Sequence, residues 1–150
     1  MDAIQFLKRQ HEEAKQMFGR IEQASASERG SLWKQLGPEL KAHEQLEEQH
    51  LYGPVARDAG DRDASLTEWE QHHRQEVSEA EAMIRKIDAT NASDQGWLEH
   101  VRKLKSTLEH HIQEEEGKIW PKIRQVWDAS KLEAAGRQME SMKGKARPAA

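Results

Sequence analysis

The sequence contains no cysteine. This absence excludes disulfide bonds, cysteine-ligated zinc, iron–sulfur clusters and catalysis by a thiol. Aromatic residues are few, with two Phe and one Tyr beside five Trp, and no apolar run approaches the ~20 residues that span a bilayer. Because the opening Met-Asp also begins no signal peptide, we expect a cytoplasmic protein that contacts no membrane.

The charge balance favours no polyanionic partner. The formal net charge is −4, and such a chain has no general attraction for nucleic acid or anionic lipid. Charged residues make up 33% and apolar residues 35%, so the chain folds only if its apolar residues form stripes, as they do on amphipathic helices. The length of 150 residues indicates one domain. The unusual abundance is histidine, of which there are eight.

Apolar residues recur with a helical period along most of the chain, and no segment alternates with a period of two for long. This pattern predicts an all-α fold with four stripes, over residues 4–21, 32–51, 66–87 and 97–119. We expect the first helix to end in a loop around residues 25–31 and the second at Gly53-Pro54. Gly37-Pro38 predicts a kink or the first turn of a shorter helix, because proline lacks the amide hydrogen.

Four helices of about twenty residues with short links predict an antiparallel up-down-up-down four-helix bundle. We assign residues 1–127 to this bundle. The remaining residues, 128–150, are expected to comprise a short helix over 130–142 and a frayed tail from Lys143 onward.

The second and fourth stripes contain the same polar motif. Residues 43–54 read HEQLEEQHLYGP and residues 111–121 read HIQEEEGKIWP. Both follow the pattern H-x-x-x-E-E, two residues, an apolar and an aromatic residue, and then proline, with one inserted residue in the first copy. In each copy the histidine and the first glutamate share one face of the helix, four residues apart. These residues are His43 with Glu47 and His111 with Glu115.

The first and third stripes each place one histidine among apolar residues. Aligning these stripes puts His73 opposite His11 and keeps the apolar positions matched. Choosing the adjacent His72 instead would put Glu68 and Glu79 in those apolar positions, so His73 is the better candidate.

In a bundle all four stripes face one axis, so six ionisable groups would meet in the core. They are His11, His43, Glu47, His73, His111 and Glu115. Two buried carboxylates without partners would each cost several kcal/mol, and a whole domain has only ~5–15 kcal/mol of net stability. Bound cations would compensate, and imidazole and carboxylate ligands suit iron, manganese or zinc. We therefore predict a metal site.

Other polar groups near these motifs are predicted to lie outside the ligand set. Glu48 and Glu116, which directly follow the two core glutamates, are expected on a solvated face. Glu44 lies near the seam and is a weaker ligand candidate. The remaining histidines are expected around the site or on the surface, with the last two exposed: His50, His72, His100 and His110.

These motifs resemble the hemerythrin-like, or HHE cation-binding, domain family. The resemblance covers roughly residues 2–127 and is carried by FLKRQHEEAKQMF, LKAHEQLEEQHLYGP, WEQHHRQEV and LEHHIQEEEGKIWP. It implies a bundle that holds two iron ions, bridged by two carboxylates and an oxo or hydroxo group. Ligand types alone also suit manganese or zinc. By this resemblance the terminal ligands would be His11, His43, His73 and His111, and the bridging ligands Glu47 and Glu115.

The sequence departs from the oxygen-carrying hemerythrins of invertebrates at two positions. Val77 stands where they have a second histidine in the third helix, and Glu115 stands four residues after His111, where they have an aspartate five residues on. Fewer histidines imply more open positions on one iron. This favours peroxide chemistry, redox sensing or iron handling over reversible oxygen carriage.

The resemblance thus implies a non-haem di-iron protein that binds or senses oxygen or a related reactive molecule, such as peroxide or nitric oxide, with iron handling as a further role. The alternative is a di-iron enzyme with catalase-like or oxidase activity, since the sequence does not commit to turnover. Two other hypotheses are a metal-free helical interaction module and a ferritin-like carboxylate site. The Glu-x-x-His spacing of ferritin-like sites occurs at Glu47/His50 and Glu70/His73.

Overall fold

The computed structural model describes residues 1–146, and all secondary structure in this part of the chain is helical. The prediction of an all-α fold is confirmed. The helices are α1 (Ala3–Gln23), α2 (Ala26–Glu47), α3 (Gly53–Ala59), α4 (Ala64–Ala89), α5 (Gln95–Glu114), α6 (Trp120–Val126) and α7 (Ala129–Ala146). Two π-helical segments, η1 (Glu48–Tyr52) and η2 (Glu115–Ile119), join α2 to α3 and α5 to α6 without a break.

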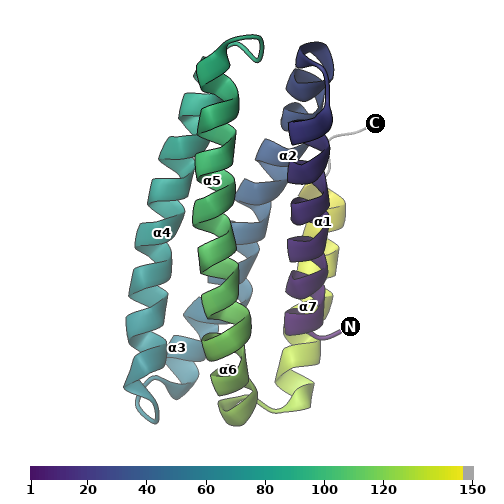
Figure 1. Cartoon of the computed structure of the whole chain (residues 1–150). Helices are drawn as coiled ribbons and strands as arrows, with labels where there is room; N and C mark the ends of the chain where they lie inside the picture. The colour runs from purple at the N-terminus through teal and green to yellow at the C-terminus, as the bar shows by residue number, and fades with distance from the viewer. Residues whose placement is uncertain (147–150) are drawn as a thin grey trace.

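The long helices lie side by side and reverse direction at short connections (Figure 1). α1 packs against α2 and α7, and α4 packs against α5. The start of α1 is fixed by a capping box, in which the Asp2 carboxylate accepts from the Gln5 amide at 2.9 Å and the Gln5 side chain accepts from the Asp2 amide. Among the described residues, no helix is both long and apolar enough to cross a membrane.

The C-terminal helix α7 is longer than predicted. It adds a fifth long helix to the four that carry the apolar stripes. Leu132, Ala135 and Met139 are buried in the same apolar cluster as the start of α1. A Cβ at Gly136 would overlap the backbone of residues 1–3, so glycine permits this close approach. Residues 147–150, which form part of the predicted tail, lie outside the described residues.

The loop predicted before the second helix is wrong in length, and one of the two alternatives predicted for Gly37-Pro38 is excluded. The loop expected around residues 25–31 is shorter, because α2 already begins at Ala26. Ser25 and Glu28 have the S-x-x-E spacing of a helix start, although the Ser25 side chain makes no capping bond. α2 is also continuous through Pro38, so the shorter helix does not occur.

The second helix does not end at Gly53-Pro54, because the π-helical segment η1 continues it. The Gly53 amide donates to the carbonyl of Glu48, five residues back. Pro54 then lies in the first turn of α3, where its missing amide hydrogen is not needed. The second copy of the motif behaves in the same way. The Trp120 amide donates to the carbonyl of Glu115, and Pro121 lies in the first turn of α6. Both segments begin where the H-x-x-x-E motif ends, and π-turns are frequent at functional sites.

A layer of buried polar residues lies between two apolar clusters. α1 shows the order: Leu7 belongs to one cluster, Phe18 to the other, and His11 lies between them. The other helices that carry the motifs pass through the same three layers. The buried polar residues are His11, Glu44, Glu47, Glu70, His73, His111 and Glu115.

Candidate metal centre

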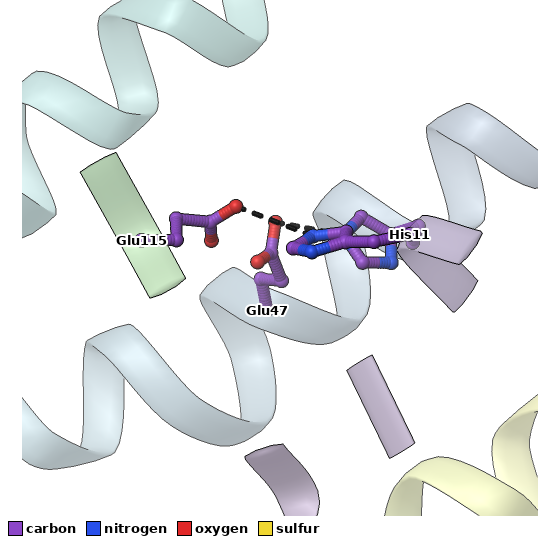
Figure 2. Close-up of side chains that lie close together, drawn as sticks. His11, Glu47 and Glu115 are labelled. Atoms are coloured by element: carbon purple, nitrogen blue, oxygen red, sulfur yellow. Dashed lines mark ion pairs between the residues drawn. The ribbon is translucent and has the colours of Figure 1, made fainter. Parts of the chain in front are cut away.

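The six residues predicted to form a metal site meet at this polar layer, five of them buried and His43 12% exposed at its edge. Their ligand atoms form two groups, and all atoms of a group lie within 4.8 Å of one another. One group comprises His11, His43, Glu47 and Glu115, and the other Glu47, His73, His111 and Glu115. Both groups therefore contain both carboxylates. Figure 2 shows these carboxylates directed toward the imidazole of His11.

Each glutamate directs one oxygen at the Nε2 atoms of two histidines. These distances are 3.2 to 3.4 Å, from Glu47 Oε1 to His43 and His73 and from Glu115 Oε1 to His11 and His111. Single oxygens thus face nitrogens that come from different helices. The bundle, rather than any one helix, assembles this geometry.

The atoms at the centre lack hydrogen-bond partners. Among the described residues, five buried atoms of the six groups make no hydrogen bond: Nε2 of His11, His73 and His111, and Oε1 of Glu47 and Glu115. An unpaired buried polar group costs about 1–3 kcal/mol, and most are paired in folded proteins. Five such atoms directed at one another are the donor set of a cation site, so these residues fit bound metal.

Each histidine is oriented by a hydrogen bond at its other ring nitrogen, Nδ1. The acceptors are Gln10 for His43 at 2.7 Å, Glu116 for His11 at 3.1 Å, Glu48 for His73 at 3.4 Å, and Glu76 for His111. We assign the N–H to Nδ1 from this network. Nε2 then keeps its lone pair toward the centre, which is the form of the ring that binds metal.

Glu48 and Glu116 correct a prediction from the sequence. They were expected on a solvated face, but their side chains are only 24% and 26% exposed and they accept hydrogen bonds from His73 and His11. The doubled glutamate of the motif was the available signal. Its first glutamate faces the centre and its second reaches a histidine on a neighbouring helix. The acceptors for the other two histidines, Gln10 for His43 and Glu76 for His111, belong to no repeated motif that could have identified them in the sequence.

The structure places His73 in the centre and its neighbour His72 on the surface. The His73 side chain is fully buried, whereas that of His72 is 49% exposed and pairs with Glu76. Glu76, His72 and Glu114 form a third, more exposed group of possible ligand atoms. The exposed His110 pairs with Glu114 at 2.8 Å.

Only one residue of each Glu-x-x-His pair of the ferritin-like hypothesis lies in the centre, namely Glu47 of the first pair and His73 of the second. Glu70 pairs with the Arg74 guanidinium at 2.6 Å, and His50 bonds to Gln138 of α7 at 3.2 Å. Neither belongs to the two central groups. His100, expected to be exposed, is half-buried and is also outside these groups.

Tyr52 contacts the carboxylate oxygens that do not face the histidines, and its ring packs edge-on against His73. Its buried hydroxyl donates to Glu115 Oε2, lies 3.5 Å from Glu47 Oε2, and accepts from Trp120 Nε1 at 2.9 Å. Burial, reinforced by the two carboxylates, raises the pKa of Tyr52 well above its usual range. The phenol therefore remains a hydrogen-bond donor that helps to fix the carboxylate of Glu115.

Burial and proximity also shift the pKa values of the central groups. Burial and the Glu47 carboxylate raise the pKa of Glu115 to about 7. Burial opposes protonation of His73, but its hydrogen bonds to Glu47 and Glu48 prevail and raise its pKa to about 9. The metal-free centre therefore holds protons at neutral pH, and a cation would have to displace them.

Glu44, the weaker ligand candidate, is buried beside the centre but belongs to neither central group. Its Oε2 has no hydrogen-bond partner among the described residues. Burial, followed by the charge of Glu47, raises the pKa of Glu44 to about 8.

Comparisons with known proteins identify a family and a fold. The sequence profile of the hemerythrin HHE cation binding domain matches residues 2–123. The fold is similar to that of a hemerythrin HHE cation binding domain-containing protein from Mycobacterium kansasii, with a TM-score of 0.75 and 24% sequence identity over 97% of this chain and 87% of that chain. At this identity, the likeness shows the fold alone. No curated protein sequence matches the chain.

Proposed function

This chain belongs to the hemerythrin family of HHE cation-binding domains, and from that premise we propose that it is a non-haem di-iron protein that binds or senses dioxygen or a related reactive molecule, such as peroxide or nitric oxide. A role in iron handling is compatible with the same site. One observation carries the proposal: two groups of four possible ligands share both Glu47 and Glu115. Two cations held by these groups would be bridged by the shared carboxylates.

The residues of the chain would hold the ions, orient their ligands and limit water. The four histidines would be terminal ligands, each fixed through its Nδ1 hydrogen bond. Leu51 and Ile119, on the two π-helical segments, are buried and restrict access of water. Six protein groups do not fill the coordination of two octahedral ions, so positions remain for a small molecule. Bound iron would supply the capacity to exchange electrons with that molecule.

A second candidate function is a di-iron enzyme with catalase-like or oxidase activity. The observation that favours it is the buried phenol of Tyr52, which donates a hydrogen bond to Glu115. Turnover of peroxide needs a group that holds a proton next to the reacting molecule. Steady-state oxygen release from peroxide, well above that of free iron and reduced in Tyr52→Phe, would support the enzyme. No release above free iron would leave the binding function.

Two adjacent histidines provide a matched test of the proposed function. Wild type, His73→Ala and His72→Ala are loaded with ferrous iron without air, assayed for bound metal, and then exposed to dioxygen while the visible spectrum is followed. Wild type and His72→Ala should bind about two irons per chain and develop a charge-transfer band. His73→Ala should lose iron and the spectral change. A wild-type spectrum unchanged by dioxygen, peroxide and nitric oxide would refute the binding function, whatever the metal content.

A further inference from the structure

The third group of possible metal ligands lies between α4 and α5, which pack side by side (Figure 1). It comprises His72 and Glu76 of α4 and Glu114 of α5, and we call it the outer group. One ligand atom from each of these residues lies within 4.8 Å of the others. None of the three belongs to the two central groups, so the outer group is a separate set of ligands brought together by the packing of two helices.

The outer group is accessible from solvent. The side chains of His72, Glu76 and Glu114 are 49%, 19% and 28% exposed, whereas the two central glutamates are fully buried. An ion in solution can therefore reach the outer group without any opening of the bundle. Water can fill the coordination positions that the three side chains leave free.

Both carboxylates of the outer group face imidazoles. Glu76 contacts His72 through Oε1 and His111 through Oε2. Glu114 pairs with His110 at 2.8 Å. Within residues 1–146, neither carboxylate forms an ion pair with a lysine or an arginine. Two carboxylates this close together repel each other, and a divalent cation between them would remove that repulsion.

We propose that the outer group binds one divalent transition-metal ion at the surface, with His72 Nε2 and one oxygen each of Glu76 and Glu114 as its ligands. One imidazole and two carboxylates suit zinc, manganese or ferrous iron. Three protein ligands with water in the remaining position is the usual arrangement of an open zinc site. Calcium does not suit this group, because it takes six to eight oxygen ligands.

Glu76 connects the outer site to the centre. Its Oε1 faces His72, and its Oε2 accepts the hydrogen bond that orients His111. One carboxylate would thus bind the outer ion and support a histidine of the centre. The outer site needs neither iron in the centre nor a reaction with dioxygen, so the inference goes beyond the proposed function.

Titration of the iron-loaded protein with zinc tests the outer site. Calorimetry measures zinc binding, and elemental analysis measures the iron content before and after. Wild type should bind about one zinc ion per chain in addition to its iron, and should keep that iron. His72→Ala removes a direct ligand and should weaken zinc binding by about 100-fold, the upper end of the loss caused by removing an outer partner of a ligand. His100→Ala is the matched control, because His100 lies on α5 outside all three groups, and its zinc affinity should stay within about twofold of wild type.

Variants of the carboxylates test the other two ligands. Glu114→Gln should weaken zinc binding by about tenfold, because cation affinity depends on the number of charged ligands. Glu109→Gln, on the same helix, should change it by less than about twofold, since Glu109 is 48% exposed and pairs with Lys105 at 4.0 Å. Glu76→Gln should weaken both zinc binding at the surface and iron binding in the centre, each by about tenfold.

The outcomes separate this inference from the proposed function. Absence of zinc binding to the iron-loaded protein would overturn the outer site and leave the di-iron function. Release of one iron for each zinc bound would place the zinc in the centre and also overturn the outer site, as would a zinc affinity that His72→Ala leaves unchanged. If the protein takes up no stoichiometric iron but His72→Ala still binds one zinc fewer than wild type, the di-iron function fails and the outer site stands.

Discussion

Replacing Glu116 by glutamine tests whether the second glutamate of the H-x-x-x-E-E motif supports metal binding. Glu116 Oε2 lies 3.1 Å from His11 Nδ1. Glutamine has nearly the same size and keeps an acceptor, so His11 should stay oriented while it loses the negative charge that makes it a stronger ligand. Loss of such an outer partner lowers metal affinity by about 10–100-fold, equivalent to ~1.4–2.7 kcal/mol. We expect about tenfold for Glu116→Gln and a value nearer 100-fold for Glu116→Ala.

Anaerobic competition for ferrous iron against a chromophoric chelator measures this effect. Glu12→Gln is the matched control, because Glu12 also lies beside His11 in sequence but is 57% exposed and pairs with the exposed Lys15 at 3.5 Å. Its affinity should stay within about twofold of wild type, as surface pairs contribute little. Glu48→Gln should lose less than Glu116→Gln, because Glu48 lies farther from His73 Nδ1, at 3.4 Å. Wild-type affinity in Glu116→Gln, or an equal loss in Glu12→Gln, would refute the reasoning.

Four further predictions follow from the same geometry. Removing metal should lower the midpoint of thermal unfolding, since a cation present at 100 times its Kd stabilises the fold by ~2.7 kcal/mol; identical calorimetric transitions with and without chelator would contradict this. Metal affinity should rise with pH through about 7 and 9, the pKa values of Glu115 and His73, because protons on these groups compete with the cation; a flat affinity profile from pH 6 to 9 would count against it. Tyr52→Phe should lower the free energy of unfolding in urea by about 1–3 kcal/mol, because the Trp120 indole and one oxygen of Glu115 lose their partner; unchanged stability would exclude this contact. Gly53→Ala should destabilise the protein by about 1–3 kcal/mol in the same assay, because a Cβ there would lie 2.8 Å from the Glu48 carbonyl oxygen. Gly117→Ala should not destabilise it, because there is open space around Gly117. Equal effects of the two substitutions would contradict the packing argument.

The periodicity of the sequence was sufficient to predict the all-α fold and the meeting of six polar groups. Helical spacing places His11 between Leu7 and Phe18, so a histidine within an apolar stripe must face the core. The choice of His73 over His72 followed from the same spacing, because only one of two adjacent residues can occupy an apolar position.

Contacts between distant segments were not predictable from periodicity. The Nδ1 acceptors on His43 and His111 are Gln10 and Glu76, which resemble any surface residue until the helices are packed. The π-helical turns were missed because Gly-Pro normally ends a helix, and a hydrogen bond to the carbonyl five residues back leaves no mark in apolar spacing. The apolar spacing of Leu132, Ala135 and Met139 was visible in the sequence, but not its partner on α1.

The central claim is that the six groups hold two iron ions, and the metal content of the purified protein tests it most directly. Elemental analysis is combined with a near-ultraviolet and visible spectrum of the same sample. We expect about two irons per chain with charge-transfer absorption, and stoichiometric manganese or zinc would keep the site but change the metal. No stoichiometric metal, even after anaerobic loading with ferrous iron, would contradict the account and reduce the centre to a set of buried groups that satisfy one another.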